Sequence, residues 1–191
     1  MARILRLVVA LVALVAPAQG WGKDAATVTL SVENGGPWGD WGDPVFCPKG
    51  SYANGFQLKV EPPQGLFRDD TALNAVRLLC SNGATATSSE GPRGTWLSPL
   101  SCSRGHLSSF RLRVEAPQGL WDDTAANNVD VACSDGRVLE GQGGLAGTWG
   151  NWSSFCPHGG GVCGLRTRLE APQRGGKDNT ALNDVEMFCC S

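Results

Sequence analysis

Hydrophobic and polar residues alternate strictly in three short segments of the chain. In the first of them, Phe56, Leu58 and Val60 are separated by Gln57 and Lys59. Successive side chains of a β-strand point to opposite faces of a sheet, so this alternation predicts a strand with one buried face. The three segments are 56–61, 110–115 and 165–170. Each runs into a proline-containing string, and because proline has no backbone N–H we expect the strands to end there.

A second set of segments alternates in the same way and ends in a cysteine. The apolar residues and the cysteine share one parity, so they lie on the same face of the predicted strand. These segments are 76–80, 129–133 and 185–189. Residues 28–32 alternate as one more strand, and 84–90 and 137–140 occupy the matching places ahead of the next two tryptophans, so we expect strands there too. The pattern therefore indicates about four strands in each part of the chain.

The same series of motifs occurs three times, so the chain is an internal repeat. Each copy has a tryptophan in a G-x-W pattern, a cysteine, an alternating strand and a string such as DDTALN. The glutamates that end the alternating strands, Glu61, Glu115 and Glu170, recur at intervals of 54 and 55 residues. We expect one domain at 21–191, built of repeats at about 24–80, 81–133 and 134–191.

Short strands joined by one longer return connection fit a Greek-key sheet. Three such sheets, each with one apolar face, bury those faces by closing around a common axis. The sequence thus predicts an all-β fold, a β-prism of three four-stranded Greek-key sheets around a pseudo-threefold axis and stapled by disulfides. A propeller is the nearest alternative, but propellers have at least four blades.

The first 20 residues have the pattern of a secretory signal peptide. Arg3 and Arg6 precede an apolar run at 7–15, and small residues at 16–18 suit cleavage. The run is too short for a membrane span, which needs about 20 apolar residues, so we expect a secreted chain without membrane insertion.

The 26 glycines disfavour a helical bundle. A formal net charge of −2 offers no basic surface for nucleic acid.

Eight cysteines in a secreted chain predict disulfides. The repeat positions indicate these pairs: Cys47–Cys80, Cys102–Cys133, and Cys156 with Cys189 or Cys190, which leaves Cys163 for the remaining cysteine. Adjacent strand residues point to opposite faces, so Cys189 and Cys190 need different partners. A zinc site of Cys156, His158 and Cys163 is the competing hypothesis, disfavoured in an oxidising compartment. We expect no metal.

Four features closely resemble the vitelline membrane outer layer protein family: the PWGDW string at 37–41, the VEPPQG and VEAPQG strings, the DDTALN-type strings and the terminal pair of cysteines. The resemblance extends over all three copies. It implies a type I β-prism, four disulfides and secretion. It also implies residence in the outer layer of the egg envelope, among mucin-like glycoprotein fibrils. The family is credited with a lysozyme-like ability to build N-acetylglucosamine oligosaccharides, which comes with no established catalytic residues.

The tryptophans divide into a repeated set and an irregular set. We assign Trp38, Trp96 and Trp149 to the repeated position and interpret them as packing residues. Trp41 and Trp152 match each other, the second copy has Pro99 at that place, and Trp121 has no equivalent. An exposed tryptophan ring can stack on the apolar face of a sugar. We therefore predict carbohydrate contact at one or more of Trp41, Trp121 and Trp152.

The repeated polar strings carry candidate acidic residues, namely Asp70, Asp123 and Asp178. Asx side chains in such strings commonly satisfy turn backbone. The functional alternative is that they bind sugar hydroxyls beside the tryptophans, or form a glycosidase-type carboxylate pair about 5–9.5 Å apart. The sequon at 151–153 predicts a glycan on Asn151.

We interpret the chain as a secreted structural protein of an extracellular coat that contacts glycans. Extracellular glycoproteins, mucin-like fibrils or oligosaccharides are the expected partners. The alternatives are a glycosyl transferase or hydrolase acting on N-acetylglucosamine oligomers, and a lectin. His106 and His158 stand near no nucleophile motif, so triad chemistry is not expected. The glycine-rich stretch at 141–147 lacks a phosphate-binding ending, and no cofactor is expected.

Overall fold

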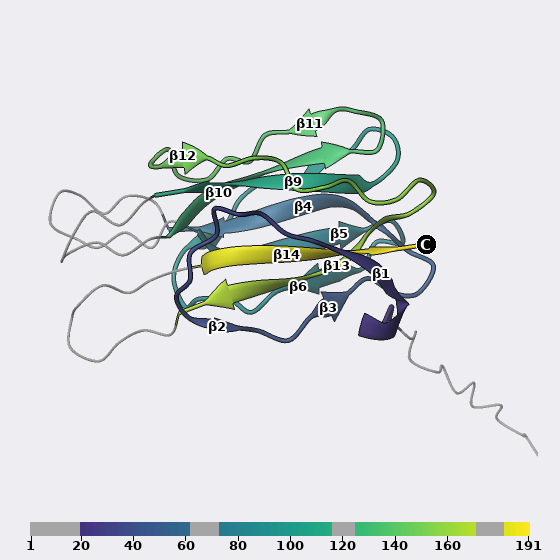
Figure 1. Cartoon of the computed structure of the whole chain (residues 1–191), viewed down its shortest axis with the longest axis horizontal. Coiled ribbons are helices and arrows are strands. Elements are labelled where there is room, and N and C mark those ends of the chain that lie inside the picture. The colour runs from purple at the N-terminus through teal and green to yellow at the C-terminus, as the bar shows by residue number, and fades with distance from the viewer. Residues whose placement is uncertain (1–19, 62–72, 116–124, 171–181) are drawn as a thin grey trace, which may run out of the picture.

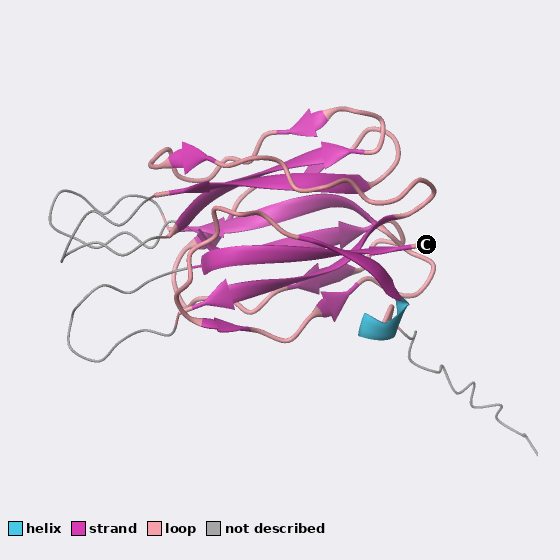
Figure 2. Cartoon of the chain, in the orientation of Figure 1, coloured by secondary structure: helices cyan, strands magenta, loops and turns pink. Residues whose placement is uncertain are grey.

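The structure is a computed structural model that describes residues 20–61, 73–115, 125–170 and 182–191. Strands and loops make up almost all of these residues, and one short 3₁₀ turn, η1 (Lys23–Ala25), precedes the first strand (Figure 2). The predicted signal peptide lies outside the described residues except for Gly20. The fold class predicted from the alternating pattern is confirmed.

Three long antiparallel hairpins form the body of the molecule (Figure 1). They are β4 (Ala53–Val60) with β5 (Leu73–Cys80), β9 (Leu107–Val114) with β10 (Ala126–Cys133), and β13 (Gly161–Leu169) with β14 (Leu182–Cys190). Phe56, Phe110 and Leu165 occupy one register position in the three hairpins and are fully buried. Each such side chain contributes about 1.5–3 kcal/mol of burial free energy. The hairpins contact one another through these faces, which form a single core.

Each of two of the three sheets takes all its strands from one continuous stretch of the chain. The first sheet has the order β6 (Thr85–Thr87), β5, β4 and β7 (Thr95–Trp96), and β8 (Leu100–Ser101) pairs with β4 beyond β7. The second has the order β11 (Val138–Leu139), β10, β9 and β12 (Thr148–Trp149). In both, the fourth strand returns to lie beside the first, which is the Greek-key arrangement.

The third sheet joins the two ends of the chain. Its order is β1 (Ala26–Leu30), β14, β13 and β2 (Asp40–Trp41), and β3 (Val45–Phe46) also pairs with β13. The N-terminal strands thus take the places that later segments of the chain fill in the other two sheets. The three sheets close around the shared core as a β-prism.

Disulfides connect each sheet to its neighbour. Cys47–Cys80 joins the third sheet to the first, Cys102–Cys133 the first to the second, and Cys156–Cys189 the second to the third. The backbone N–H of Cys156, for example, donates to the carbonyl of Ser108 in β9 (2.8 Å), which holds this half of the bridge on the second sheet. The prism is therefore covalently closed at all three corners.

The fourth disulfide, Cys163–Cys190, lies within the β13–β14 hairpin. It packs with Phe188 and Phe46 on the outer side of the third sheet, whereas Cys189 belongs to the central core. The two adjacent cysteines point to opposite faces, and the choice left open for Cys156 falls on Cys189. Because Cys156 and Cys163 are both in disulfides, their sulfurs are not available for the zinc alternative.

Candidate functional site

The short strands β2, β7 and β12 place one tryptophan on the outer face of each sheet. Trp41 is paired with Arg168, Trp96 with Lys59 and Trp149 with Arg113. A glycine with positive φ stands two residues before each, namely Gly39, Gly94 and Gly147. An added Cβ at Gly147 would meet the backbone of Val114, so the glycine of the G-x-W pattern marks a close approach between two segments of the chain.

The assignment of Trp38 to the repeated tryptophan position was wrong. Trp41 shares the register of Trp96 and Trp149, and Trp38 is 48% exposed rather than packed. Both Gly36-Pro37-Trp38 and Gly39-Asp40-Trp41 fit a G-x-W pattern, and only the second has the positive-φ glycine. The spacing to cysteine was the available signal, since Trp41 and Trp96 both lie six residues before one.

Guanidinium groups cover the outer tryptophans. Arg166 lies 4.7 Å from the ring centroid of Trp41, and Arg111 lies 4.6 Å from Trp149 and 5.0 Å from Trp152. Cation–π stacking of this kind contributes about 0.5–1 kcal/mol at exposed sites. A sugar cannot stack on the ring face that an arginine covers. Trp41 and Trp152 therefore each have at most one ring face available for stacking on a sugar.

The same arginines are anchored by acidic partners. Arg111 donates to Oδ2 of the buried Asp130 (2.8 Å), whose Oδ1 accepts from the backbone N–H of Gly141 (2.9 Å). Arg166 donates to Glu186 in the equivalent place on the third sheet (2.6 Å). These pairs hold the two arginines beside the tryptophans and neutralise their positive charge.

Four predicted sugar-contact residues lie outside the described residues: Trp121, Asp70, Asp123 and Asp178. Their mutual spacing, and with it the carboxylate-pair hypothesis, stays a prediction. Asn151 is exposed, while the Ser153 hydroxyl of its sequon is buried and donates to the carbonyl of Ser154 (2.7 Å). Glycosylation of Asn151 also stays a prediction.

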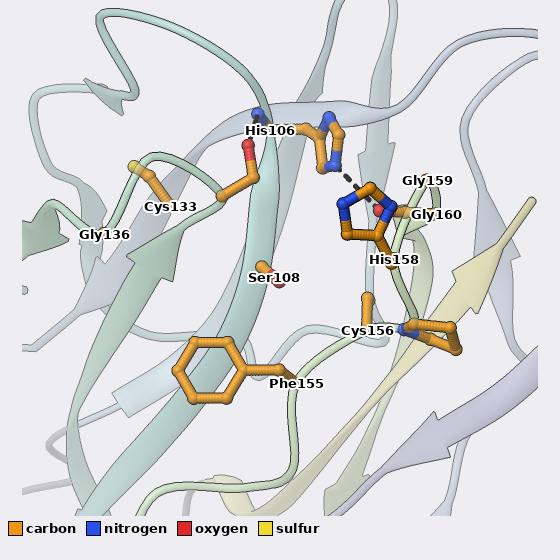
Figure 3. Close-up of a pocket in the computed structure, with 11 residues that line it drawn as sticks. His106, Ser108, Cys133, Gly136, Phe155, Cys156, His158, Gly159 and Gly160 are labelled. Carbon is orange, nitrogen blue, oxygen red and sulfur yellow. Dashed lines mark hydrogen bonds between the residues drawn. The ribbon is translucent and has the colours of Figure 1, made fainter.

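A pocket of about 400 Å³ opens where the second sheet meets the third (Figure 3). Its walls are the turn of Ser134 and Gly136, the turn 156–160, and the side chains of Phe155 and His106. In Figure 3 the imidazoles of His106 and His158 lie on one side of the view and the phenyl ring of Phe155 on the other. Phe155 is 59% exposed, which is unusual for so large an apolar side chain.

Beside this pocket, the packing of the segment before the bridging cysteine differs from that at the other two corners. In the first and third sheets, β8 and β3 lie directly against Gly55 and Gly164, where an added Cβ would collide with them. Ser109 has the same register in the second sheet, and its hydroxyl donates to the carbonyl of Ser153 (3.1 Å). The segment before Cys156 also holds one extra residue, since Trp149 lies seven residues before its cysteine.

The hydrogen bonds of this segment locate the extra residue. The backbone N–H groups of Ser153 and Cys156 donate to the carbonyls of Phe110 and Ser108. Two residues, Ser154 and Phe155, therefore bulge between these anchors, whereas a single residue, Ser101 or Phe46, lies between the matching anchors of the other copies. Phe46, at the matching place, packs on Phe188 (5.4 Å between ring centroids), whereas the bulge turns Phe155 outward.

His106 forms the rigid side of the pocket. Its Nε2 is 2.8 Å from the carbonyl oxygen of Gly160, and its ring centroid is 5.4 Å from that of Tyr52. Gly161 packs directly under the imidazole, where a Cβ would collide with it. No role was expected for His106 or Phe155, and His158 was considered only as a ligand in the disfavoured zinc alternative. The seven-residue spacing and the replacement of glycine by Ser109 were the signals that could have identified this place.

Asp184 of β14 is the one group in the described part of the chain with a clearly displaced pKa. Burial raises the pKa of its carboxyl from 3.8 to about 6, and the nearby charge of Glu186 acts in the same direction. The backbone N–H of Val185, which donates to Oδ1 (2.8 Å), and the charge of Arg168 lower it. Asp184 packs against the backbone of Gly35, away from the pocket.

Comparison with known proteins identifies close relatives along nearly the whole chain. A family model described as Vitelline membrane outer layer protein I matches residues 28–191. The human Vitelline membrane outer layer protein 1 homolog is 51% identical over 180 residues, covering 91% of this chain and 88% of the relative. The mouse protein of the same description is 48% identical over 169 residues, covering 85% and 83%.

Solved structures with the same fold include lectins. The artocarpin–mannotriose complex aligns with a TM-score of 0.53 at 14% identity, over 87% of this chain and 99% of the lectin. Calystegia sepium agglutinin aligns with a TM-score of 0.57 at 12% identity, over 86% and 96%. Identities this low establish the fold alone. In the described part of the chain, no helix has the length and apolar character that crossing a membrane would require.

Proposed function

Because the chain belongs to the Vitelline membrane outer layer protein I family, we propose that it is a secreted structural protein of an extracellular coat, such as the outer layer of the egg vitelline membrane, and that it contacts glycans there. The observation that carries this proposal is the family match, which runs through all three repeats from residue 28 to the last residue.

The construction of the prism supports a structural role outside the cell. The four disulfides include one at each corner of the closed prism, and such bridges persist in oxidising compartments. In the chain-entropy account, each of the three bridges between sheets raises the free energy of unfolding by about 3–4 kcal/mol. A body closed in this way resists local opening, which suits a permanent component of a coat.

Glycan contact has weaker but independent support. Artocarpin, which has the same fold, was solved with mannotriose bound. The exposed Phe155 beside polar groups is the kind of surface on which a sugar ring can stack. The enzymatic alternative gains no support at this place, since none of the residues lining the Phe155 pocket is acidic.

Secretion and glycan binding can be tested on one preparation. The full chain is expressed in cultured animal cells, and the protein in the medium is analysed by mass spectrometry and then on a glycan array. We expect an N-terminus near residue 20, intact disulfides and binding to at least one class of glycan. Retention of the chain inside the cells would contradict the coat assignment, and an array without signal would contradict the glycan contact.

A further inference from the structure

We propose that the pocket between Phe155 and His158 is a binding subsite for one neutral hexopyranose residue of a glycan. The proposal rests on the glycan contact proposed above and adds its location and the chemical class of the ligand. It follows from four features of the pocket: its origin, its lining, its open backbone and its rigidity.

The Phe155 wall of the pocket is peculiar to the third corner of the prism. The first and second corners of the prism make the same inter-sheet bridge with a six-residue segment and no bulge. At the third corner Ser109 and the extra residue lift Ser154 and Phe155 off β9. The bulge leaves a phenyl ring 59% exposed, an arrangement that the packing of the prism alone does not explain.

The lining selects an uncharged ligand with one apolar face. No Asp, Glu, Lys or Arg lines the pocket, so nothing there would neutralise an ionic ligand. The Phe155 ring supplies an apolar platform, and the Ser134 hydroxyl and the His158 imidazole supply groups that donate or accept hydrogen bonds. A pyranose ring matches this division, since its C–H face is apolar and its hydroxyls point outward at the edge.

Two glycines keep the rim of the pocket open. Gly136 and Gly159 both have positive φ, and an added Cβ at either would meet no atom within 4 Å. The backbone of both turns is therefore accessible to a ligand at close range. The volume of about 400 Å³ falls within the ~300–1,000 Å³ of small-ligand pockets.

The pocket is also fixed in shape before any ligand arrives. Cys133 and Cys156 in its wall belong to two different inter-sheet disulfides. The Ser134 hydroxyl accepts the backbone N–H of His106 (3.2 Å), and the His106 ring is held by Gly160. A preorganised site loses little conformational entropy on binding, so even a small contact area can give a measurable affinity.

The test titrates the full chain with methyl α-mannopyranoside, mannotriose and triacetylchitotriose by calorimetry. The variants are Phe155→Ala and His158→Ala. Leu145→Ala is the matched control, because it also removes an exposed apolar side chain, 81% exposed, from another part of the surface. We expect at least a tenfold loss of affinity for Phe155→Ala, a smaller loss for His158→Ala and no change for Leu145→Ala.

The outcomes separate this proposal from the one on which it rests. If the parent chain binds a probe and Phe155→Ala binds it equally well, the subsite is wrong while glycan contact stands. If the parent chain binds none of the three probes, and Phe155→Ala binds the array glycans as well as the parent does or the bound glycans contain no neutral hexopyranose, the assignment of the pocket is overturned. If it binds no glycan at all, both proposals fail. Near-UV circular dichroism verifies that each variant is folded.

Discussion

One register position carries a different side chain in each hairpin. Ala75, Asn128 and Asp184 lie opposite Lys59, Arg113 and Arg168, respectively. Asn128 uses both ends of its amide, since its Nδ2 donates to the carbonyl of Gly141 (2.8 Å) and its Oδ1 accepts from the N–H of Gly143 (3.0 Å). Asp184 meets the same kind of glycine backbone with a carboxylate, and its burial is what raises its pKa.

Replacing this carboxyl by an amide should stabilise the protein at neutral pH. Because the pKa of Asp184 is raised in the folded state, its contribution to stability is fully present below 3.8 and is lost as the pH rises through about 6. We expect Asp184→Asn to raise the free energy of unfolding by about 1 kcal/mol at pH 7.5, after allowance for solvent screening at this partly exposed position.

Denaturant titrations of both proteins at pH 3.5, 5 and 7.5 measure this effect. The advantage of the variant should be smallest at pH 3.5 and largest at pH 7.5. Asn128→Asp is the matched control, because it places the same carboxyl at the same register of the second sheet. Asn128→Asp should lower the free energy of unfolding at pH 7.5. A stability gain of Asp184→Asn that does not change with pH would contradict the raised pKa of Asp184.

The segment that precedes each bridging cysteine is the element in which the three copies differ most. In two copies it is a short strand, β3 or β8, lying against a glycine, and in the third it bulges above Ser109. Two local changes coincide there, one residue added to the segment and one side chain added to the strand beneath. Either change alone interferes with the close pairing seen at the other corners.

Reversing both changes should rebuild the missing strand. In a variant with Ser109→Gly and Ser154 deleted, we expect residues 153–156 to pair with β9 as β8 pairs with β4. Amide hydrogen exchange of this segment should slow by at least tenfold, and the Phe155 ring should become buried. Ser109→Gly alone serves as the control and should leave the bulge in place. Unchanged exchange in the double variant would show that other contacts impose the bulge.

The closure of the whole molecule depends on its N-terminal strands. β1 pairs with β14, and Leu30 is fully buried in the core. Without β1, the backbone of β14 would become an open sheet edge, and open edges promote association between chains. Strands β1 and β14 thus complete one sheet, although more than 150 residues separate them in the sequence.

Truncation tests this dependence. A chain that begins at Gly35 lacks β1, and we expect its free energy of unfolding to fall by roughly 2–5 kcal/mol, the usual cost of deleting a buried Leu-sized contact. Light scattering should also detect self-association. A chain that begins at Gly20 keeps every described strand and should match the parent in both measurements. A monomeric Gly35 variant with the parent's thermal midpoint would contradict a closing role for β1.

The linear pattern was sufficient for the fold class and for most of the disulfide framework. Alternation with period two depends only on which face of a strand is buried, and it located the long hairpins around Phe56, Phe110 and Leu165. The cysteines at equivalent positions of the repeats indicated the pairs Cys47–Cys80 and Cys102–Cys133. Strand alternation is a local pattern and the cysteine spacing recurs in each repeat, so both can be recognised in the sequence.

Other features depended on contacts between distant segments. That Trp41, and not Trp38, takes the repeated position follows from pairing with β13, more than a hundred residues away. That arginines cover Trp41 and Trp152 follows from register across strands. The exposure of Phe155 accompanies one added residue above Ser109, where the other two strands have a glycine, and depends on packing between segments far apart in the sequence. Pairing, register and burial across sheets are properties of the closed prism, which no local window of the chain contains.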